Sequence, residues 1–431
     1  MLKNSLLGFY EPSFFEMHVC TDEHLDDLNK LSSKNLSVFF HEYVHFLQDT
    51  TTSFGLINLA NAVNVQKALN SHINKQTSPF SVPVDWEATH PDVYNISLAF
   101  DMYWGESNSN FDSSSFVQGI GWADGCVQGF EKQIPWIYVD YIRSGKREKC
   151  CFGALAIMES MAYMLESMIC DVVTSAPDYP YHFVELLAQY RYPEIKDDKI
   201  LLILLCDIAL NTYHPGKFLD ETITRWARDK FLPKNYEEAY QYAEKYTFID
   251  LNKVKYTFET LYEKSVREGI DAFAGYFTVP NFEPVKNWGV KLMQTALEIR
   301  QQRPYYWIEI LQKPTKHERR MEFYSLFFSK LGTPLMINNL DECTFSAKNL
   351  YQGDINLMTT LRALKEIRNY LTKQGQQHCS LSQFCQKSIN ISQMDCTNPW
   401  KVFLRKDLHQ LQLCPFCQLL KAWGIYKNQP Q

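Results

Sequence analysis

Residues 36–49 read Leu-Ser-Val-Phe-Phe-His-Glu-Tyr-Val-His-Phe-Leu-Gln-Asp and contain the pattern His-Glu-x-x-His, where x is any residue. Residues four apart on a helix lie on one face, so the imidazoles of His41 and His45 can converge on one metal ion. Glu42 follows the first histidine and can reach a water held on that ion, where a general base is needed. The flanks are apolar and lack Pro and Gly, which predicts a buried helix. The motif on this helix predicts a metal site. The alternative is an ordinary helix that carries two histidines.

This motif and its surroundings resemble those of the zinc metallopeptidases of the zincin group. The longer zincin consensus has uncharged residues inside and around the motif and an apolar residue two places after the second His. This chain has suitable residues at those positions, namely Tyr43, Val44, Phe46 and Leu47. Metzincins, one zincin subgroup, also carry Gly three places and His six places after the second His, where this chain has Gln48 and Thr51. These two differences exclude the metzincins. A third zinc ligand must therefore come from another part of the chain.

The best source of a third ligand is the stretch 152–166, which is apolar nearly all round and predicts a buried helix. Glu159 and Glu166 lie seven residues apart on one face of it, and a buried carboxylate needs a charge partner or a metal. The pattern resembles that of gluzincins, in which a Glu on a later helix completes a His-His-Glu site, and this resemblance implies that Glu159 is the ligand. Glu166 or Asp49 would orient a ligating histidine, and either is an alternative ligand. A pairing of Glu159 and Glu166 with Arg or Lys in the core is the other interpretation.

Three residues are candidates for stabilising the oxyanion that forms when a carbonyl is attacked. Tyr163 lies between the two glutamates of the predicted helix. Tyr213 and His214 follow the very apolar helix expected at 200–210, although a Tyr-His pair at a helix end commonly has only a capping role.

The predicted fold class is α+β and predominantly helical. We expect a zincin-like catalytic lobe with a small sheet at 1–215, interrupted by a long insertion at about 76–150, and a helical second lobe at 216–375. Residues 136–142 are a candidate strand of the sheet that flanks the metal helix in zincins, whose edge strand pairs with an extended substrate. From residue 181 onward the chain is expected to be almost entirely helical.

The residues 376–431 hold a second group of potential metal ligands. Cys414 and Cys417 form a C-x-x-C turn that lets two thiolates meet one tetrahedral ion, and Cys385 and Cys396 are the best other pair. Three further residues are alternative ligands for this ion: Cys379, His378 and His409. The pattern predicts a small Cys-rich module held by a structural zinc. A redox C-x-x-C and cysteines that bind no metal are the alternatives.

Bulk properties limit the functional classes. The chain has 431 residues and a formal net charge of −6, which argues against nucleic acid or an anionic membrane as the main partner. No apolar run approaches the length of a membrane span, and the first residues turn polar too soon for a secretory signal, so a cytoplasmic location is expected.

Together these observations predict a cytoplasmic zinc-dependent peptidase that acts on a protein or peptide substrate, with one catalytic and one structural zinc ion. A regulatory protein partner is also possible for an intracellular peptidase. Two alternatives stay open, namely a catalytically inactive zincin-like binding or regulatory protein with structural zinc, and a metal-dependent hydrolase of a non-peptide amide.

Overall fold

A computed structural model describes the chain except for residues 1–6, 77–78, 107–115, 126–133, 144, 250–253, 348–354, 373–378, 380, 382–398, 408–412, 429 and 431. Helices predominate in it and the sheets are small, which confirms the predicted α+β, mainly helical class. Its α-helices are α1 (Ser33–Thr51), α2 (Ser53–Lys75), α3 (Pro91–Trp104), α4 (Ala154–Ile169), α5 (Asp178–Tyr181), α6 (Phe183–Arg191), α7 (Lys199–Leu210), α8 (Pro215–Asp229), α9 (Tyr236–Glu244), α10 (Phe258–Ala274), α11 (Glu283–Gln302), α12 (Tyr306–Leu311), α13 (Lys316–Phe323), α14 (Ser329–Leu331), α15 (Ile355–Thr372) and α17 (Pro415–Ala422).

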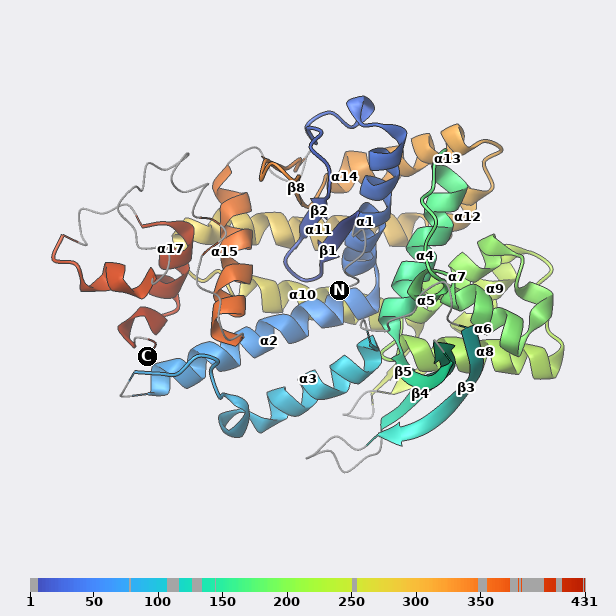
Figure 1. Ribbon diagram of the computed structural model, residues 1–431, viewed down its shortest axis with the longest axis horizontal. Coiled ribbons are helices and arrows are strands. Elements are labelled where there is room, and N and C mark those ends of the chain that lie inside the picture. Colours follow the sequence, from blue (N-terminus) through green and yellow to red (C-terminus); the bar gives the residue numbers. More distant parts are fainter. Residues whose placement is uncertain are drawn as a thin grey trace.

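The longest helices set the shape of the molecule. Figure 1 shows α2, α10 and α11 along the long axis, α15 and α17 at one end, and α6 to α9 at the other. Helix α10 packs on both α2 and α11. Short 3-10 or π-helical turns supplement the α-helices at Leu28–Lys30, Glu87–Thr89, Pro193–Ile195, Pro280–Phe282, Tyr324–Phe328, Pro399–Leu404 and Ile425–Lys427.

Three separate sheets are found among the described residues. The first has the order β1-β2-β8-β9, with β2 and β8 parallel and the other two pairs antiparallel. The second is the antiparallel sheet β3-β4-β5, and β6 pairs with β7. The strands are β1 (Gly8–Glu11), β2 (Glu16–Val19), β3 (Phe116–Gly125), β4 (Ile134–Arg143), β5 (Lys146–Phe152), β6 (Phe248–Ile249), β7 (Lys255–Tyr256), β8 (Leu335–Ile337) and β9 (Cys343–Thr344).

The sheets correct two expectations. Residues 136–142 do form a strand, β4, but β4 is paired on both sides and has no free edge for a substrate. The strands that pack against α1 are instead β1 and β2. The chain after residue 181 is mainly helical, but it also contributes the four short strands β6 to β9, of which β8 returns to pair with β2. A strand this short has no hydrophobic periodicity from which it could be predicted.

Helix α1 forms as predicted from its apolar pattern and has defined ends. Ser32 is its N-cap and accepts a hydrogen bond from the Asn35 amide. The helix stops at Thr52, which is extended and caps α2 by accepting from the Gly55 amide. The turn between the two helices is tight, because a Cβ on Gly55 would lie 2.4 Å from the Gln48 carbonyl oxygen. Glycine is therefore required where α2 leaves α1.

The largest hydrophobic cluster contains residues from all three predicted ranges, 1–215, 216–375 and 376–431. It includes Phe46 of α1, Trp288 of α11 and Trp400 of the tail, all of them fully buried. The tail is also attached by polar contacts, since the Trp423 indole donates to the Tyr276 carbonyl at 3.2 Å. The described part of residues 376–431 thus packs against the main body. Across the described residues, every helix falls short of the length and apolar character needed to span a bilayer.

Candidate metal centre

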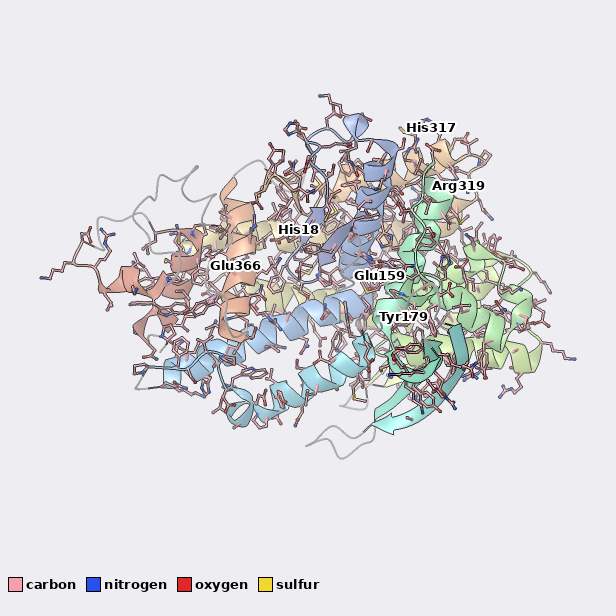
Figure 2. The ribbon with its side chains drawn as sticks, viewed as in Figure 1. His18, Glu159, Tyr179, His317, Arg319 and Glu366 are labelled. Carbon is pink, nitrogen blue, oxygen red and sulfur yellow. The ribbon has the colours of Figure 1, made fainter. Side chains whose placement is uncertain are left out.

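The centre lies between α1 and α4, which pack against each other. His41 and His45 lie on α1, and Glu159 of α4 contacts both of them. Figure 2 shows Glu159 near the middle of the molecule. The Glu159 Oε2 atom lies 3.1 Å from His41 Nε2 and 3.4 Å from His45 Nε2. All three ligand atoms lie within 4.8 Å of one another. The structure therefore brings together the three residues that were predicted from the sequence as zinc ligands.

The spacing of these atoms suits a zinc ion. Nitrogen and oxygen ligands lie about 2.0–2.1 Å from zinc, so two of them at tetrahedral positions are separated by roughly 3.3–3.4 Å. The measured 3.1 and 3.4 Å are close to that value. Two imidazoles and one carboxylate also form the donor set of many catalytic zinc sites, in which a fourth position stays open. The residues present fit the ion.

Both histidines are held by a second contact through their other ring nitrogen. His41 Nδ1 lies 3.1 Å from Glu166 Oε2, and the Ser37 hydroxyl donates to the other oxygen of that carboxylate. His45 Nδ1 lies 2.8 Å from the Gln48 side-chain oxygen, and the Gln48 amide group donates to a main-chain carbonyl of α4. Such partners favour a proton on Nδ1 and leave Nε2 for a metal.

These contacts distinguish between the two residues that were predicted to orient a ligating histidine, Glu166 and Asp49. Glu166 orients His41, as expected for one of the two candidates. Asp49 does not orient a histidine but accepts hydrogen bonds from the Tyr10 hydroxyl at 3.0 Å and the Ser13 amide at 2.8 Å. It joins α1 to the N-terminal hairpin, and burial raises the pKa of its carboxyl to about 7. Gln48, three residues after His45, has the orienting role, and no sequence signal marked it.

Glu42 lies on the same helix as the two histidines and is influenced by their charges. It is buried on α1, and this burial raises the pKa of its carboxyl to about 7 although His41 and His45 oppose the rise. A base works best with a pKa near the operating pH. Strand β1 covers it closely, since a Cβ on Gly8 would lie only 3.0 Å from the Glu42 Cγ. A larger residue in place of Gly8 would displace the Glu42 side chain.

The metal-free cluster holds protons. Burial lowers the pKa of His41, but hydrogen bonds to Glu159 and Glu166 outweigh it and raise the pKa well above the ordinary value. Burial also lowers the pKa of His45, but the charge of Glu159, its hydrogen bond and the charge of Glu42 together outweigh burial and raise this pKa. A cation that binds here takes the place of these protons, so binding strengthens as the pH rises.

The oxyanion candidates are not placed as expected. The Tyr163 hydroxyl donates to the Thr174 carbonyl at 3.3 Å, and its ring packs on Tyr181. Tyr181, at the end of α5, is the closer phenol, with its ring centroid 5.8 Å from that of His41. The negative charge of Glu159, together with burial, raises its pKa and keeps it protonated. Tyr181 follows Tyr179-Pro180 and has no helical spacing to the ligands, so its position could not be predicted from the sequence.

Tyr213 and His214 lie at the start of α8 and line a different cavity, to which none of the three clustered donors contributes. The His214 ring accepts a hydrogen bond from the Lys217 amide at 3.4 Å and so caps α8. This is the capping role that such a pair commonly has. Neither residue belongs to the cluster of potential metal ligands.

The predicted tail zinc site falls largely outside the described residues. Cys385, Cys396, His378 and His409 are not among them. Cys414 and Cys417 are buried at the start of α17, where the Cys414 sulfur accepts from the Cys417 amide at 3.5 Å. In the described residues, His41, His45 and Glu159 form the one group of three or more donors with metal-binding spacing. The structural zinc stays a prediction.

Comparisons with known proteins place the chain in no group. No family model matches it, and neither a curated protein nor a solved structure does. The residues of the centre are therefore the basis for inferring its function.

The third ligand can be tested by a matched pair of substitutions. Glu159→Gln and Glu166→Gln each remove one negative charge from the same helix. Loss of an orienting partner weakens metal binding by about 10- to 100-fold, so Glu166→Gln should fall in that range and Glu159→Gln should exceed it. Competition with a chromophoric zinc chelator measures both affinities. The reverse order would make Glu166 the ligand.

Proposed function

We propose that this protein is a zinc-dependent peptidase with a gluzincin-like centre of His41, His45 and Glu159. The observation that supports this proposal most directly is the convergence of two imidazole nitrogens and one carboxylate oxygen beside the buried Glu42. A zinc site that is purely structural usually has four protein ligands, whereas a catalytic site has three and an open position. The three-donor set favours a catalytic role.

When bound, a zinc ion would supply a Lewis acid that polarises the peptide carbonyl and makes the attacking water more acidic. Glu42 would accept a proton from the attacking water, because it is the buried carboxylate on the helix that carries both histidines and is not itself one of the three donors. It then passes the proton to the leaving amine. Strand β1 covers the Glu42 side chain and so limits its movement on α1.

Tyr181 takes the role that the sequence assigned to Tyr163, Tyr213 or His214. A phenol that remains protonated can donate a hydrogen bond to the negative oxygen that develops on the carbonyl carbon. Glu166 and Gln48 hold the two imidazoles so that their Nε2 atoms face the same place.

Burial of Glu42 favours catalysis over a binding role. Burying a carboxylate in apolar surroundings costs free energy, and a structural metal site gains nothing from a base beside it. The proposal therefore places the protein among hydrolases, with a peptide or protein as its substrate.

The test is hydrolysis by the purified full-length chain. The protein is mixed with peptides from a digested cell extract, and new termini are identified by mass spectrometry. We expect cleavage that stops when a zinc chelator is added and returns with zinc. Elemental analysis should give at least one zinc per chain, and a second if the tail module binds one. A fully zinc-loaded chain that cleaves no peptide bond would contradict the proposal.

A further inference from the structure

The Tyr-His pair at the start of α8, which the metal centre does not use, lines a cavity of about 250 Å³. The cavity lies between the first half of α8 and the β6 segment, in the part of the molecule where Figure 1 shows α8 beside the β3-β4-β5 sheet. Its lining residues include Lys217, Phe218, Glu221, Arg225, Tyr246 and Phe248.

One wall of this cavity is aromatic. Phe218 is half-buried at its centre, and its ring contacts those of Tyr246 at 5.4 Å and Phe248 at 6.1 Å between centroids. These rings offer both edges and faces to anything that enters. Aromatic ligands pack on such surfaces in offset or edge-to-face arrangements.

The cavity also has a positively charged part, which two cations on one face of α8 provide. Lys217 and Arg225 are two turns apart, and both line the cavity. Lys217 has a loose contact with Glu221 at 3.9 Å, in which the Glu221 side chain is half exposed. The Arg225 guanidinium lies over the Tyr246 ring at 4.9 Å, and no carboxylate of the described residues is within ion-pair distance of it.

A second cavity of about 390 Å³ lies on the other side of Arg225. It includes Arg191 and Arg228, but each of these already has a carboxylate partner, Asp220 and Asp229 respectively, at 2.8 Å. Arg225 is thus the cation between the two cavities that lacks a close carboxylate within the described part of the chain. The carboxylates of Asp220 and Glu221 also line this second cavity, so the positive charge that a ligand can meet comes mainly from Arg225 and in part from Lys217.

We propose that the cavity between α8 and β6 binds a small anionic ligand that carries a planar aromatic group. Arg225 and Lys217 hold its phosphate or carboxylate, and Phe218, Tyr246 and Phe248 hold its ring. A guanidinium pairs well with either anion through two parallel N–H bonds. The ligand is either a nucleoside monophosphate or an aromatic carboxylate such as the free C-terminus of a peptide. This site is separate from the metal centre and does not depend on the peptidase proposal.

Isothermal titration of the full-length protein with paired probes tests the site. AMP is compared with adenosine, and N-acetylphenylalanine with its amide, so that each pair differs only in the anion. We expect one of the two anions to bind saturably and its neutral partner at least tenfold more weakly. The pair that shows this difference identifies the source of the ligand. Inorganic phosphate should bind more weakly than AMP, since it has no ring.

Substitutions then locate the binding. Arg225→Gln should weaken binding of the preferred anion at least tenfold, and Lys217→Gln should weaken it less, because its charge is partly offset by Glu221. Arg267→Gln is the matched control, since Arg267 is exposed on α10 and lines none of the cavities described above. Absence of saturable binding by wild type, or equal affinity in Arg225→Gln, Lys217→Gln and wild type, would overturn the proposal.

Discussion

Replacing Glu42 with Gln is expected to leave zinc binding intact and to slow peptide hydrolysis by a factor of about 10² to 10⁴, the usual contribution of a general base. Glutamine has nearly the same shape, but its amide cannot accept a proton from water. Glu42 is not one of the three clustered donors, so the ion should remain. Steady-state rates on the cleaved peptide and zinc content by elemental analysis give the two readouts.

The control for this experiment is His41→Ala. It removes one of the three ligands, so both zinc at this centre and hydrolysis should be lost. Zinc content that is unchanged in His41→Ala would show that the ion binds elsewhere. Full activity in Glu42→Gln would mean that another group takes the proton.

The Glu42→Gln substitution is also expected to change the stability of the metal-free protein. The folded-state pKa of Glu42 is about 7, which is above its ordinary value of 4.5, so the folded chain holds this proton more tightly than the unfolded chain does. Stability from this group is complete below about pH 4.5 and falls as the pH rises towards 7. The difference is worth roughly 3 kcal/mol. Metal-free Glu42→Gln should therefore lose less stability than wild type between pH 5 and pH 8, as measured by urea denaturation.

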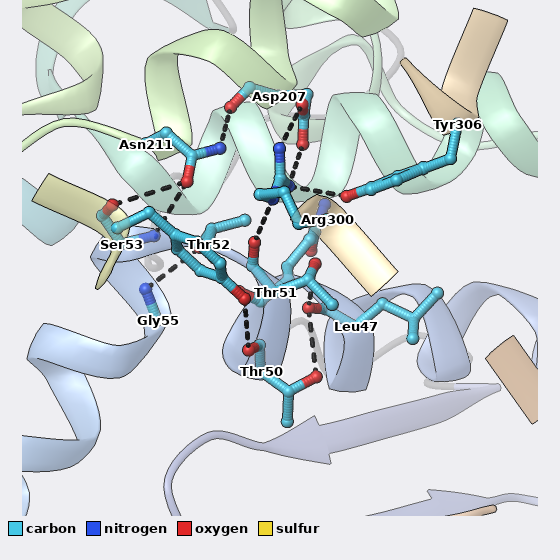
Figure 3. Close-up of polar contacts among 12 residues, drawn as sticks. Leu47, Thr50, Thr51, Thr52, Ser53, Gly55, Asp207, Asn211, Arg300 and Tyr306 are labelled. Carbon is cyan, nitrogen blue, oxygen red and sulfur yellow. Dashed lines mark hydrogen bonds and ion pairs between the residues drawn. The ribbon is translucent and has the colours of Figure 1, made fainter. Parts of the chain in front are cut away.

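Replacing Arg300 with Met is expected to lower the free energy of unfolding by about 3–5 kcal/mol, the usual result of removing one partner from a buried ion pair. Figure 3 shows the guanidinium of Arg300 donating to both oxygens of Asp207, at 3.1 and 2.9 Å. It also donates to the Thr51 carbonyl at 3.0 Å and the Tyr306 hydroxyl at 2.6 Å. Asp207 is almost fully buried, so its charge would be left without its main partner.

These contacts join four helices at the end of α1. Arg300 comes from α11, Asp207 from α7 and Tyr306 from α12, and the Thr51 carbonyl ends the helix that carries the two histidines. Asn211 extends the network by accepting a hydrogen bond from the Ser53 amide at the start of α2. The ion pair thus fixes the position of α1 relative to the second half of the chain.

Two further variants separate the ion pair from general packing. Arg228→Met breaks an exposed pair with Asp229, and the midpoint of its urea denaturation should stay near that of wild type, because exposed pairs contribute little. The double variant Arg300→Met with Asp207→Leu should be less destabilised than the sum of the two single changes, since it leaves no unpaired buried charge. An additive result would mean that the pair is not coupled.

Much of the centre could be predicted because its parts are local. The apolar pattern around His41 and His45 predicts α1, and the apolar stretch that holds Glu159 predicts α4, and both helices are present. Helical periodicity places both imidazoles on one face whatever surrounds the helix. The partners that come from distant or irregular segments could not be predicted. Tyr181 approaches through a short segment after a proline, and Gly8 approaches through the β1 hairpin.

The sequence by itself determined that two imidazoles share a helix face and that two carboxylates share another. It did not determine which carboxylate meets which nitrogen. Glu159 and Glu166 lie two turns apart on α4, about 10 Å along its axis, so the choice depends on how far α4 is shifted against α1. Only the tertiary structure decided this, because packing of the two helices sets the shift. The result places Glu159 against the Nε2 atoms of His41 and His45, and Glu166 against Nδ1 of His41.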